Sequence, residues 1–442
     1  MNRAGFGGTP EEIQKLHALG QQGAVEFLLQ SGEDLDLFPP PKLELMSPKM
    51  RKIRVLEAGQ EEKDRQLAAG RASARENGLL LRHWWLNRMR ETPNPVREKA
   101  TLFWHGHWAT SIKKVKDPFL MHQQNETLRA YALGPFAPMA KEITRDPAMM
   151  RYLDLHTSSV KNPNENFARE VLELFTLGEG HYSEDDIAAA ARAFTGYRIN
   201  RETGRFEFNA RLADDGPKSF MGVTGSLGGD DVLDIVLGNP QCPEFLAAKL
   251  WTFYAGRPPS DDLQKLLGEE YRRCGMNTGL FLRAMFNSRD FFSTEIVRHQ
   301  IKSPVQWIVQ MCKILELPLP ELKKTQQLLA NLGQNLFDPP NVKGWDGGRA
   351  WISSSTLLVR YNAAGNMLRG AAGEMPPLDH IVPPTLSPEA MAETLSWRLF
   401  QAPLPLPLHK KTMAFVAENG TSAAARRDLV HLLMSTPEFQ LT

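Results

Sequence analysis

This 442-residue sequence has few cysteines, almost no excess of charge of one sign and no long apolar run. The three cysteines, Cys242, Cys274 and Cys312, form neither a zinc-ligand spacing nor an even disulfide framework, so we expect a fold without disulfides. The 52 Lys and Arg residues balance 51 Asp and Glu residues, and the net charge of +1 predicts no nucleic-acid partner. No apolar run approaches the ~18–20 residues of a spanning helix, so we expect a soluble chain without a membrane span.

Helical periodicity runs through almost the whole sequence and predicts a mainly α fold, a multi-helix globular protein. Thr9-Pro10-Glu11-Glu12 is a typical helix start, and Ser183 with Asp186 resembles a capping box. Strand signals are rare: only residues 197–209 alternate clearly, with a Glu-Thr-Gly turn, which predicts one small β-hairpin. Amphipathic helices with Pro or Gly stops are predicted at 241–256, 276–292, 302–316, 389–400 and 422–436.

Proline-rich stretches suggest how the chain is divided. We predict a main helical domain over 1–373, with sub-boundaries near residues 40 and 240. Five prolines between 374 and 388 cannot continue a helix. The stretch therefore predicts a connector at the start of a 374–442 piece, whose C-terminal helices pack on the main domain.

Two histidines lie among aromatic residues in the segment 103–108, Phe-Trp-His-Gly-His-Trp. Side chains at i and i+2 point about 200° apart on a helix, so His105 and His107 can share a site only if Gly106 breaks the turn. The aromatic neighbours indicate burial. Two interpretations stay open: metal ligation by at least one histidine, or two core histidines bonded to neighbouring groups.

The segment 162–178 predicts a helix that is apolar around most of its circumference. At ~100° per residue, four polar side chains fall within about 100° of one another: Asn166, Arg169, Glu170 and Glu173. A solvent-facing helix usually has a wider polar face, so this narrow stripe favours a polar pocket. The alternative is an exposed edge on which Arg169 neutralises its neighbours.

In the pocket interpretation, Glu170 and Glu173 are buried, because the rest of their helix is apolar. An unpaired buried carboxylate costs several kcal/mol. We therefore expect both carboxylates to bond to Arg169, Arg192 or a histidine of 105–107. Arg192 itself lies in an alanine-rich helix, where it either faces solvent or is buried with a carboxylate partner.

Two loops offer further polar or aromatic groups. The turn Ala213-Asp-Asp-Gly-Pro-Lys218 can provide oxygen ligands or a helix cap. The loop 333–355 contains Trp345 and Trp351 near charged residues, an arrangement that suits the face of a sugar ring. Packing of the indoles under the loop is the alternative.

Several long strings identify the chain as similar to a known family, the bacterial domain of unknown function 1800 family. The resemblance runs nearly from end to end. The strings are RAGFGGTPEE (3–12), EKATLFWHGHWATS (98–111), RDPAMMRYLD (145–154), NPNENFAREVLELFTLGEGHYSEDDI (162–187), ARAFTGY (191–197), DDGPKSFMG (214–222) and FDPPNVKGWDGGRAWISSS (337–355).

The resemblance implies a mainly helical protein of a type abundant in planctomycetes, with no established activity. It also implies relatives that are often exported to the periplasm or cell envelope and are often encoded beside a sulfatase-like protein. This N-terminus has no basic-then-apolar export signal, so any such signal has been removed. Many relatives have His-Asp before the Gly-x-Lys turn, whereas this chain has Ala213-Asp214, which weakens a nitrogen-ligated metal site here.

The first functional hypothesis is a buried His/Glu/Arg site, in a hydrolase that a divalent metal such as Zn or Mn assists. Paired carboxylates in a partly dry pocket suit acid–base chemistry, because their repulsion raises one pKa. The candidate catalytic residues are Glu170, Glu173 and Arg192; the candidate ligand-binding residues are Asn166, Arg169, Lys218, Trp345 and Trp351; the candidate metal ligands are His105, His107 and Asp214.

The second hypothesis is a non-catalytic scaffold that binds a saccharide or a sulfatase-like partner. In that case the polar stripe is a structural salt-bridge network and the tryptophan loop is the contact surface. No nucleophile elbow, phosphate loop, dinucleotide fingerprint or His-Glu-x-x-His motif occurs, so the common enzyme classes find no support.

Overall fold

The fold is mainly α-helical, as the sequence predicts. The computed structural model describes residues 1–30, 37–43, 60–200, 202–370 and 377–442. Among these, no helix combines the length and the apolar character needed to cross a membrane. Cys242, Cys274 and Cys312 are free thiols.

The α-helices have the following bounds: α1 Pro10–Ala18, α2 Gly20–Leu29, α4 Gln60–Glu91, α5 Pro95–His107, α6 Ile112–Val115, α7 Pro118–Tyr131, α8 Phe136–Thr144, α9 Pro147–Tyr152, α10 Glu165–Glu170, α11 Glu184–Ala193, α12 Gly229–Gly238, α13 Gln241–Ala255, α14 Asp261–Arg273, α15 Thr278–Asn287, α16 Pro304–Ile314, α17 Leu322–Asn331, α18 Ser354–Arg369, α19 Pro388–Phe400, α20 Leu406–Asn419 and α21 Ala423–Met434. The shorter helical turns are η2 Leu155–Thr157, η3 Val171–Thr176, η4 Ala210–Leu212, η5 Asp290–Phe292, η6 Gly348–Trp351 and η7 Pro437–Gln440.

Helix starts follow the predicted capping chemistry. Glu12 donates its backbone N–H to Thr9 Oγ1 at 3.4 Å, and Thr9 donates its own N–H to Glu12 Oε2 at 2.9 Å. Ser183 and Asp186 form the same reciprocal pair at the start of α11. Each pair satisfies backbone donors that the first helical turn leaves without a partner, so local sequence sets these two boundaries.

The predicted hairpin is confirmed, and a second one accompanies it. Strands β1 (Tyr197–Ile199) and β2 (Phe206–Phe208) pair antiparallel, with Tyr197 opposite Phe208. Strands β3 (Lys218–Phe220) and β4 (Val223–Gly225) form a separate antiparallel pair. All four strands have three residues, and the alternating pattern that predicted the first hairpin was not recognised at 218–225.

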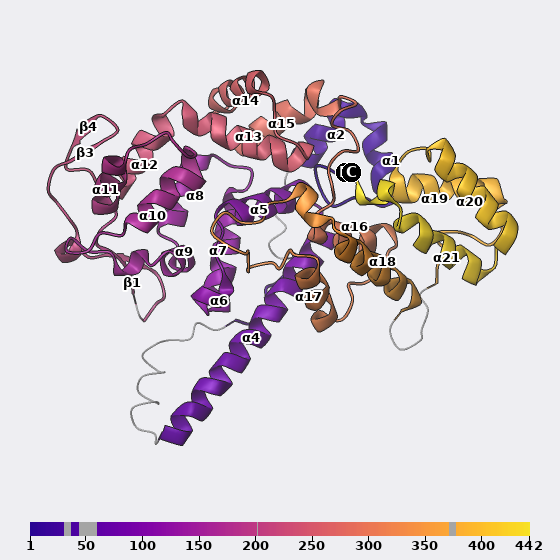
Figure 1. Ribbon diagram of the computed structural model, residues 1–442, viewed down its shortest axis with the longest axis horizontal. Helices are drawn as coiled ribbons and strands as arrows, with labels where there is room; N and C mark the ends of the chain where they lie inside the picture. Colours follow the sequence, from indigo (N-terminus) through magenta and orange to yellow (C-terminus); the bar gives the residue numbers. More distant parts are fainter. Residues whose placement is uncertain (31–36, 44–59, 201, 371–376) are drawn as a thin grey trace.

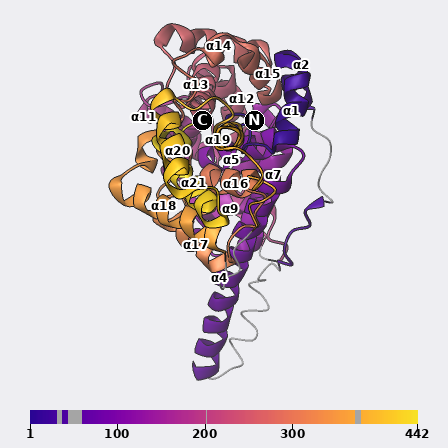
Figure 2. The same ribbon diagram turned by 90° about the vertical axis from the view of Figure 1, so that its right-hand side faces the viewer.

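The helices form two lobes, each with its own hydrophobic cluster (Figure 1). The larger cluster draws on α5 and on α7 to α15, and the other on α4 and on α16 to α21. Helix α5 serves both, because Trp104 packs in the first cluster and Leu102 in the second. Figure 2 shows the N-terminal part of α4 extending away from both lobes.

The C-terminal helices share the second cluster with α4 and α16, through residues such as Leu395, Leu429, Leu86 and Ile308. The predicted boundaries near residues 40, 240 and 373 stay predictions. Residues 374–376 of the predicted connector lie outside the described residues, and 377–387 contain no helix.

Candidate functional site

The polar helix at 162–178 changes its winding within the predicted stripe. Asn164 caps α10 by accepting the Phe167 N–H at 2.9 Å. After Glu170 the helix widens into the π-helix η3, in which the Leu177 N–H reaches back five residues to the Leu172 oxygen at 2.9 Å. π-Helices are rare and occur frequently at functional sites. The regular 100° spacing therefore fails within the stripe, between Glu170 and Glu173.

Glu170 and Glu173 are half-buried rather than enclosed. Tyr182 donates its hydroxyl to Glu173 Oε2 at 3.0 Å. Within the described part of the chain, Glu170 forms no hydrogen bond or ion pair. The predicted ion pairs of these carboxylates were wrong, because Arg169 pairs with Glu184 and Arg192 pairs with Asp214.

Two tyrosines and a lysine complete the surroundings of the acidic pair. Burial and repulsion from Glu173 raise the pKa of Glu170, although Lys343 opposes the shift. Burial, followed by the charges of Glu170 and Asp338, raises the pKa of Tyr152. Burial and the bond to Glu173 raise the pKa of Tyr182 to about 12. We call the group Tyr152, Glu170, Glu173, Tyr182 and Lys343 the Glu170 site.

The loop before α18 carries Lys343, whose charge acts on Glu170, and it also carries Trp345. Figure 1 shows this loop passing beside α5. Gly344 lies against α5 so closely that a Cβ on it would come 2.3 Å from the Gly106 oxygen. Trp345 packs beside Gly106 and His105, with its ring centroid 5.8 Å from that of His105. Glycine at 344 is therefore needed for the loop to cross α5, whereas a Cβ at Gly106 would make an ordinary contact with the Trp345 ring at 3.7 Å.

Asp338 anchors the same loop. Its carboxylate accepts from Ser111 Oγ at 2.8 Å and from Asn335 Nδ2 at 3.0 Å, and Lys113 Nζ lies 2.9 Å away. Trp351, the second predicted sugar platform, is buried with 6% of its surface exposed, whereas Trp345 remains half-buried. Of the two indoles of this loop, Trp345 is therefore the one near the surface.

His105 and His107 are both enclosed by aromatic rings. His105 Nε2 accepts the Phe337 N–H at 3.0 Å, and its ring meets that of Trp85 edge-on at 5.0 Å. His107 Nε2 donates to the Phe175 oxygen at 3.1 Å. Burial lowers the pKa of His105 to about 3 and that of His107 well below its usual value. Both rings are thus neutral and occupy the positions of core histidines.

Arg192, Asp214 and Lys218 form a self-contained cluster at the second hairpin. Arg192 Nε donates to Asp214 Oδ2 at 2.7 Å, and its Nη2 donates to Oδ1 at 3.2 Å. Lys218 Nζ donates to the backbone oxygens of Asp214 at 2.7 Å and Gly216 at 2.9 Å. The bond from Arg192 lowers the pKa of Asp214. This cluster fixes the 213–218 turn, while Asn166 is exposed to solvent.

The candidate metal ligands do not meet. His105 and His107 lie in different ring clusters, and Asp214 is bonded to Arg192. Over the ranges that the structure describes, no group of three or more His, Cys, Asp or Glu side chains is arranged to hold a metal ion. The expected Zn or Mn therefore has no ligand group among these residues.

A buried charge centre on α4, α5 and α7 went unnoticed in the sequence. Glu98 is fully buried and accepts from Arg88 Nε at 2.8 Å, Arg129 Nε at 2.6 Å and Trp85 Nε1 at 2.8 Å. Burial alone raises the pKa of Glu98, but the two guanidinium groups lower it below its usual value. Glu98 stands in the charged run Arg97-Glu98-Lys99, so the sequence of α5 carried no signal that separated it from a surface charge.

These features define a mainly helical protein with a closed structural charge centre and an open acidic site on a π-helical turn. A family model described as "Protein of unknown function (DUF1800)" matches residues 1–441, and the chain belongs to this family. A search of the curated proteins and a search of the solved structures found no match.

Proposed function

We propose that the Glu170 site binds a saccharide and hydrolyses a glycosidic bond by acid–base catalysis. The observation that carries this proposal is the Glu170 carboxylate, which is half-buried, lies beside a second carboxylate and has no bonding partner among the described residues. Protein interiors normally pair such groups, so an unpaired carboxylate next to the π-helical turn suits a ligand.

The two carboxylates have different surroundings, as acid–base catalysis requires. The raised pKa of Glu170 favours its protonated form, which would donate a proton to the leaving glycosidic oxygen. The Glu173 carboxylate, held by the Tyr182 hydroxyl, would take a proton from water as the water oxygen bonds to the anomeric carbon and the glycosidic bond breaks.

Aromatic and cationic neighbours support binding of a sugar. Trp345 is half-buried, and its indole lies on the loop that also carries Lys343. Aromatic faces stack on the apolar faces of sugars, while carboxylates and an ammonium group bond to hydroxyl groups. Tyr152 and Tyr182 provide further hydroxyls in the same region.

The test uses 4-nitrophenyl glycosides and soluble oligosaccharides of several sugar types. We expect turnover of at least one substrate class, reduced about 10²–10⁴-fold in Glu170→Gln and in Glu173→Gln. Glu184→Gln is the matched control, since Glu184 lies on the adjacent helix and pairs with Arg169 outside the acidic pair. Turnover that survives both substitutions in the acidic pair would refute the proposed catalysis.

Saccharide binding without catalysis is the second candidate, and the half-exposed Trp345 favours it. In that case Trp345→Ala should abolish oligosaccharide binding in calorimetry, and no substrate should be turned over. Binding lost in Trp345→Ala but kept in Glu170→Gln would identify a scaffold. A sulfatase-like partner and a planctomycete origin stay implications of the family resemblance.

A further inference from the structure

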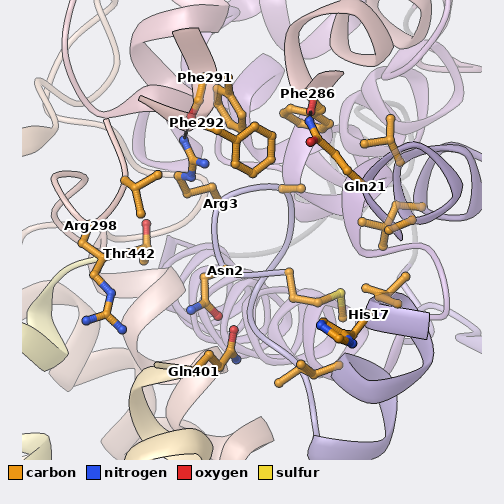
Figure 3. Close-up of a pocket in the computed structure, with 18 of the residues that line it drawn as sticks. Asn2, Arg3, His17, Gln21, Phe286, Phe291, Phe292, Arg298, Gln401 and Thr442 are labelled. Atoms are coloured by element: carbon orange, nitrogen blue, oxygen red, sulfur yellow. Dashed lines mark hydrogen bonds between the residues drawn. The ribbon is translucent and has the colours of Figure 1, made fainter. Parts of the chain in front are cut away.

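A cavity of about 660 Å³ lies far along the chain from the Glu170 site, and the two share no residue. Its walls come from residues 1–4, from α1 and α2, and from segments near 286–298 and 400–401 (Figure 3). Small-molecule sites usually have volumes of roughly 300–1,000 Å³. Phe292 and Val297 line it while keeping 48% and 38% of their surface exposed, so the cavity is open to solvent.

The lining combines apolar walls with positive charge. Apolar side chains dominate it, among them Leu16, Val25, Phe286 and Phe291. Two arginine side chains, Arg3 and Arg298, belong to the lining, together with His17, Met1 and Thr442, and no Asp or Glu side chain of the described residues does. A mostly apolar cavity with two guanidinium groups is complementary to an apolar molecule that carries a negative group.

Arg3 is the central cation of the cavity (Figure 3). Its Nη1 donates to the Phe291 oxygen at 2.6 Å, and its guanidinium carbon lies 3.8 Å from the Phe291 ring centroid. An arginine has five N–H donors, and the described residues provide this one acceptor. Burial lowers the pKa of Arg3 to about 10, so it stays charged at neutral pH.

Arg298 adds a second cation on another wall. Its Nη2 donates to the Phe400 oxygen at 2.9 Å, and no carboxylate of the described residues pairs with it. Behind it lies Lys302, which is 2% exposed and stacks on the Phe439 ring at 3.8 Å. Burial, with the charges of Arg360 and Arg298, lowers the pKa of Lys302 well below its usual value, so the positive charge of this wall is that of Arg298 itself.

We propose that this cavity binds an amphipathic anion, a medium-chain carboxylate whose alkyl chain lies on the apolar walls and whose carboxylate bonds to Arg3 and Arg298. Burying the alkyl chain supplies the non-directional part of the affinity. The two guanidinium groups supply charge-assisted hydrogen bonds that a neutral or cationic amphiphile cannot make.

The first test compares decanoate, decanol and decylammonium by calorimetric titration of the full chain. These ligands share the alkyl chain and differ in the head group. We expect decanoate to bind roughly tenfold or more tightly than decanol, the worth of one charge-assisted hydrogen bond, and decylammonium to bind weakest. Equal affinities for decanoate and decanol, or the absence of decanoate binding, would overturn the proposal.

Variants then locate the site. Ala24→Trp places an indole in the cavity and should abolish decanoate binding. Arg298→Met should reduce the preference for decanoate over decanol roughly tenfold, as should Arg3→Met. Arg283→Met is the matched control, since Arg283 pairs with Glu26 and does not line the cavity.

Among the residues that the structure describes, Arg298 bonds only to a backbone oxygen, so Arg298→Met keeps the test decisive where Arg3→Met fails to fold. Unchanged decanoate binding in folded Ala24→Trp, or an equal loss of decanoate preference in Arg283→Met, would show that the ligand binds elsewhere.

Discussion

The carboxylates of Glu98 and Glu170 have opposite surroundings. Glu98 is fully buried, and two arginines and an indole N–H bond to it. Glu170 is half-buried at the end of α10, beside Glu173, and no described group bonds to it. The pKa of Glu98 is lowered by its guanidinium partners, whereas burial and the neighbouring carboxylate raise the pKa of Glu170.

The difference separates structural charge from functional charge. A completed network such as that of Glu98 leaves no donor or acceptor for a ligand, and it joins α4, α5 and α7. A carboxylate without a bonding partner, such as Glu170, destabilises the free protein. It can form hydrogen bonds when a ligand binds. Asp214 is an intermediate case, because it has a charged partner, Arg192, but this ion pair lies at the protein surface.

The strongest test of this comparison is Glu98→Gln. The substitution leaves the buried guanidinium groups of Arg88 and Arg129 without their counter-charge, so we expect a loss of about 3–5 kcal/mol in the free energy of unfolding. Urea denaturation measures it. Glu126→Gln, which removes a partly exposed partner of Arg129, is the control and should cost far less. A loss below about 1 kcal/mol in Glu98→Gln would show that the centre is not structural.

The second prediction concerns the neutral core histidines. His105→Phe leaves the buried Phe337 N–H without an acceptor, which should cost about 1–3 kcal/mol at pH 7. The folded-state pKa of His105, about 3, lies below its ordinary value of 6.5, so protons are taken up on unfolding. Stability should therefore fall as pH drops from 6.5 toward 3. Thermal unfolding across this range should show a weaker pH dependence in His105→Phe, and an unchanged dependence would contradict a buried neutral ring.

The third prediction tests the intermediate case. Asp214→Asn removes the negative charge to which Arg192 donates two hydrogen bonds. We expect a loss of about 0.5–1 kcal/mol in the free energy of unfolding, as for a partly exposed ion pair. A double-mutant cycle with Arg192→Gln isolates the interaction. Additive losses would mean that the pair contributes nothing to the 213–218 turn.

The smallest expected effect has the opposite sign. Glu170→Gln removes repulsion between carboxylates three residues apart, so we expect a gain of roughly 0.2–0.5 kcal/mol at pH 8. Because the folded-state pKa of Glu170 is raised, its carboxylate destabilises the fold only as pH rises through that pKa. The gain should vanish at about pH 3, well below the ordinary pKa of 4.5, where Glu170 is protonated in both the folded and the unfolded state.

Glu165→Gln is the control for this variant, since it removes an acid from the favourable first turn of α10 and should lose stability. A clear loss of stability in Glu170→Gln would show that Glu170 has a stabilising partner in the folded protein, as Glu98 has.

Local patterns predicted most of the fold. The five helices predicted between 241 and 436 are present as α13, α15, α16, α19 and α21, and the hairpin at 197–209 has its predicted place. Capping residues and amphipathic spacing act over a few residues, so the sequence displays them directly. The winding of 171–176 was not visible, because a π-helix forms where packing requires it rather than where a local motif specifies it.

Composition and periodicity by themselves determined a mainly helical chain without a charge excess, and its motifs determined the family. Tertiary structure alone decided which charges are paired. Glu98 meets Arg129 from another helix, and Arg192 meets Asp214 rather than Glu170. Partners distant along the chain are chosen by how helices pack, and the energy of a charge depends on burial and on those partners. For that reason the sequence could indicate candidate residues, but only the fold showed which of the described charged groups have bonding partners and which have none.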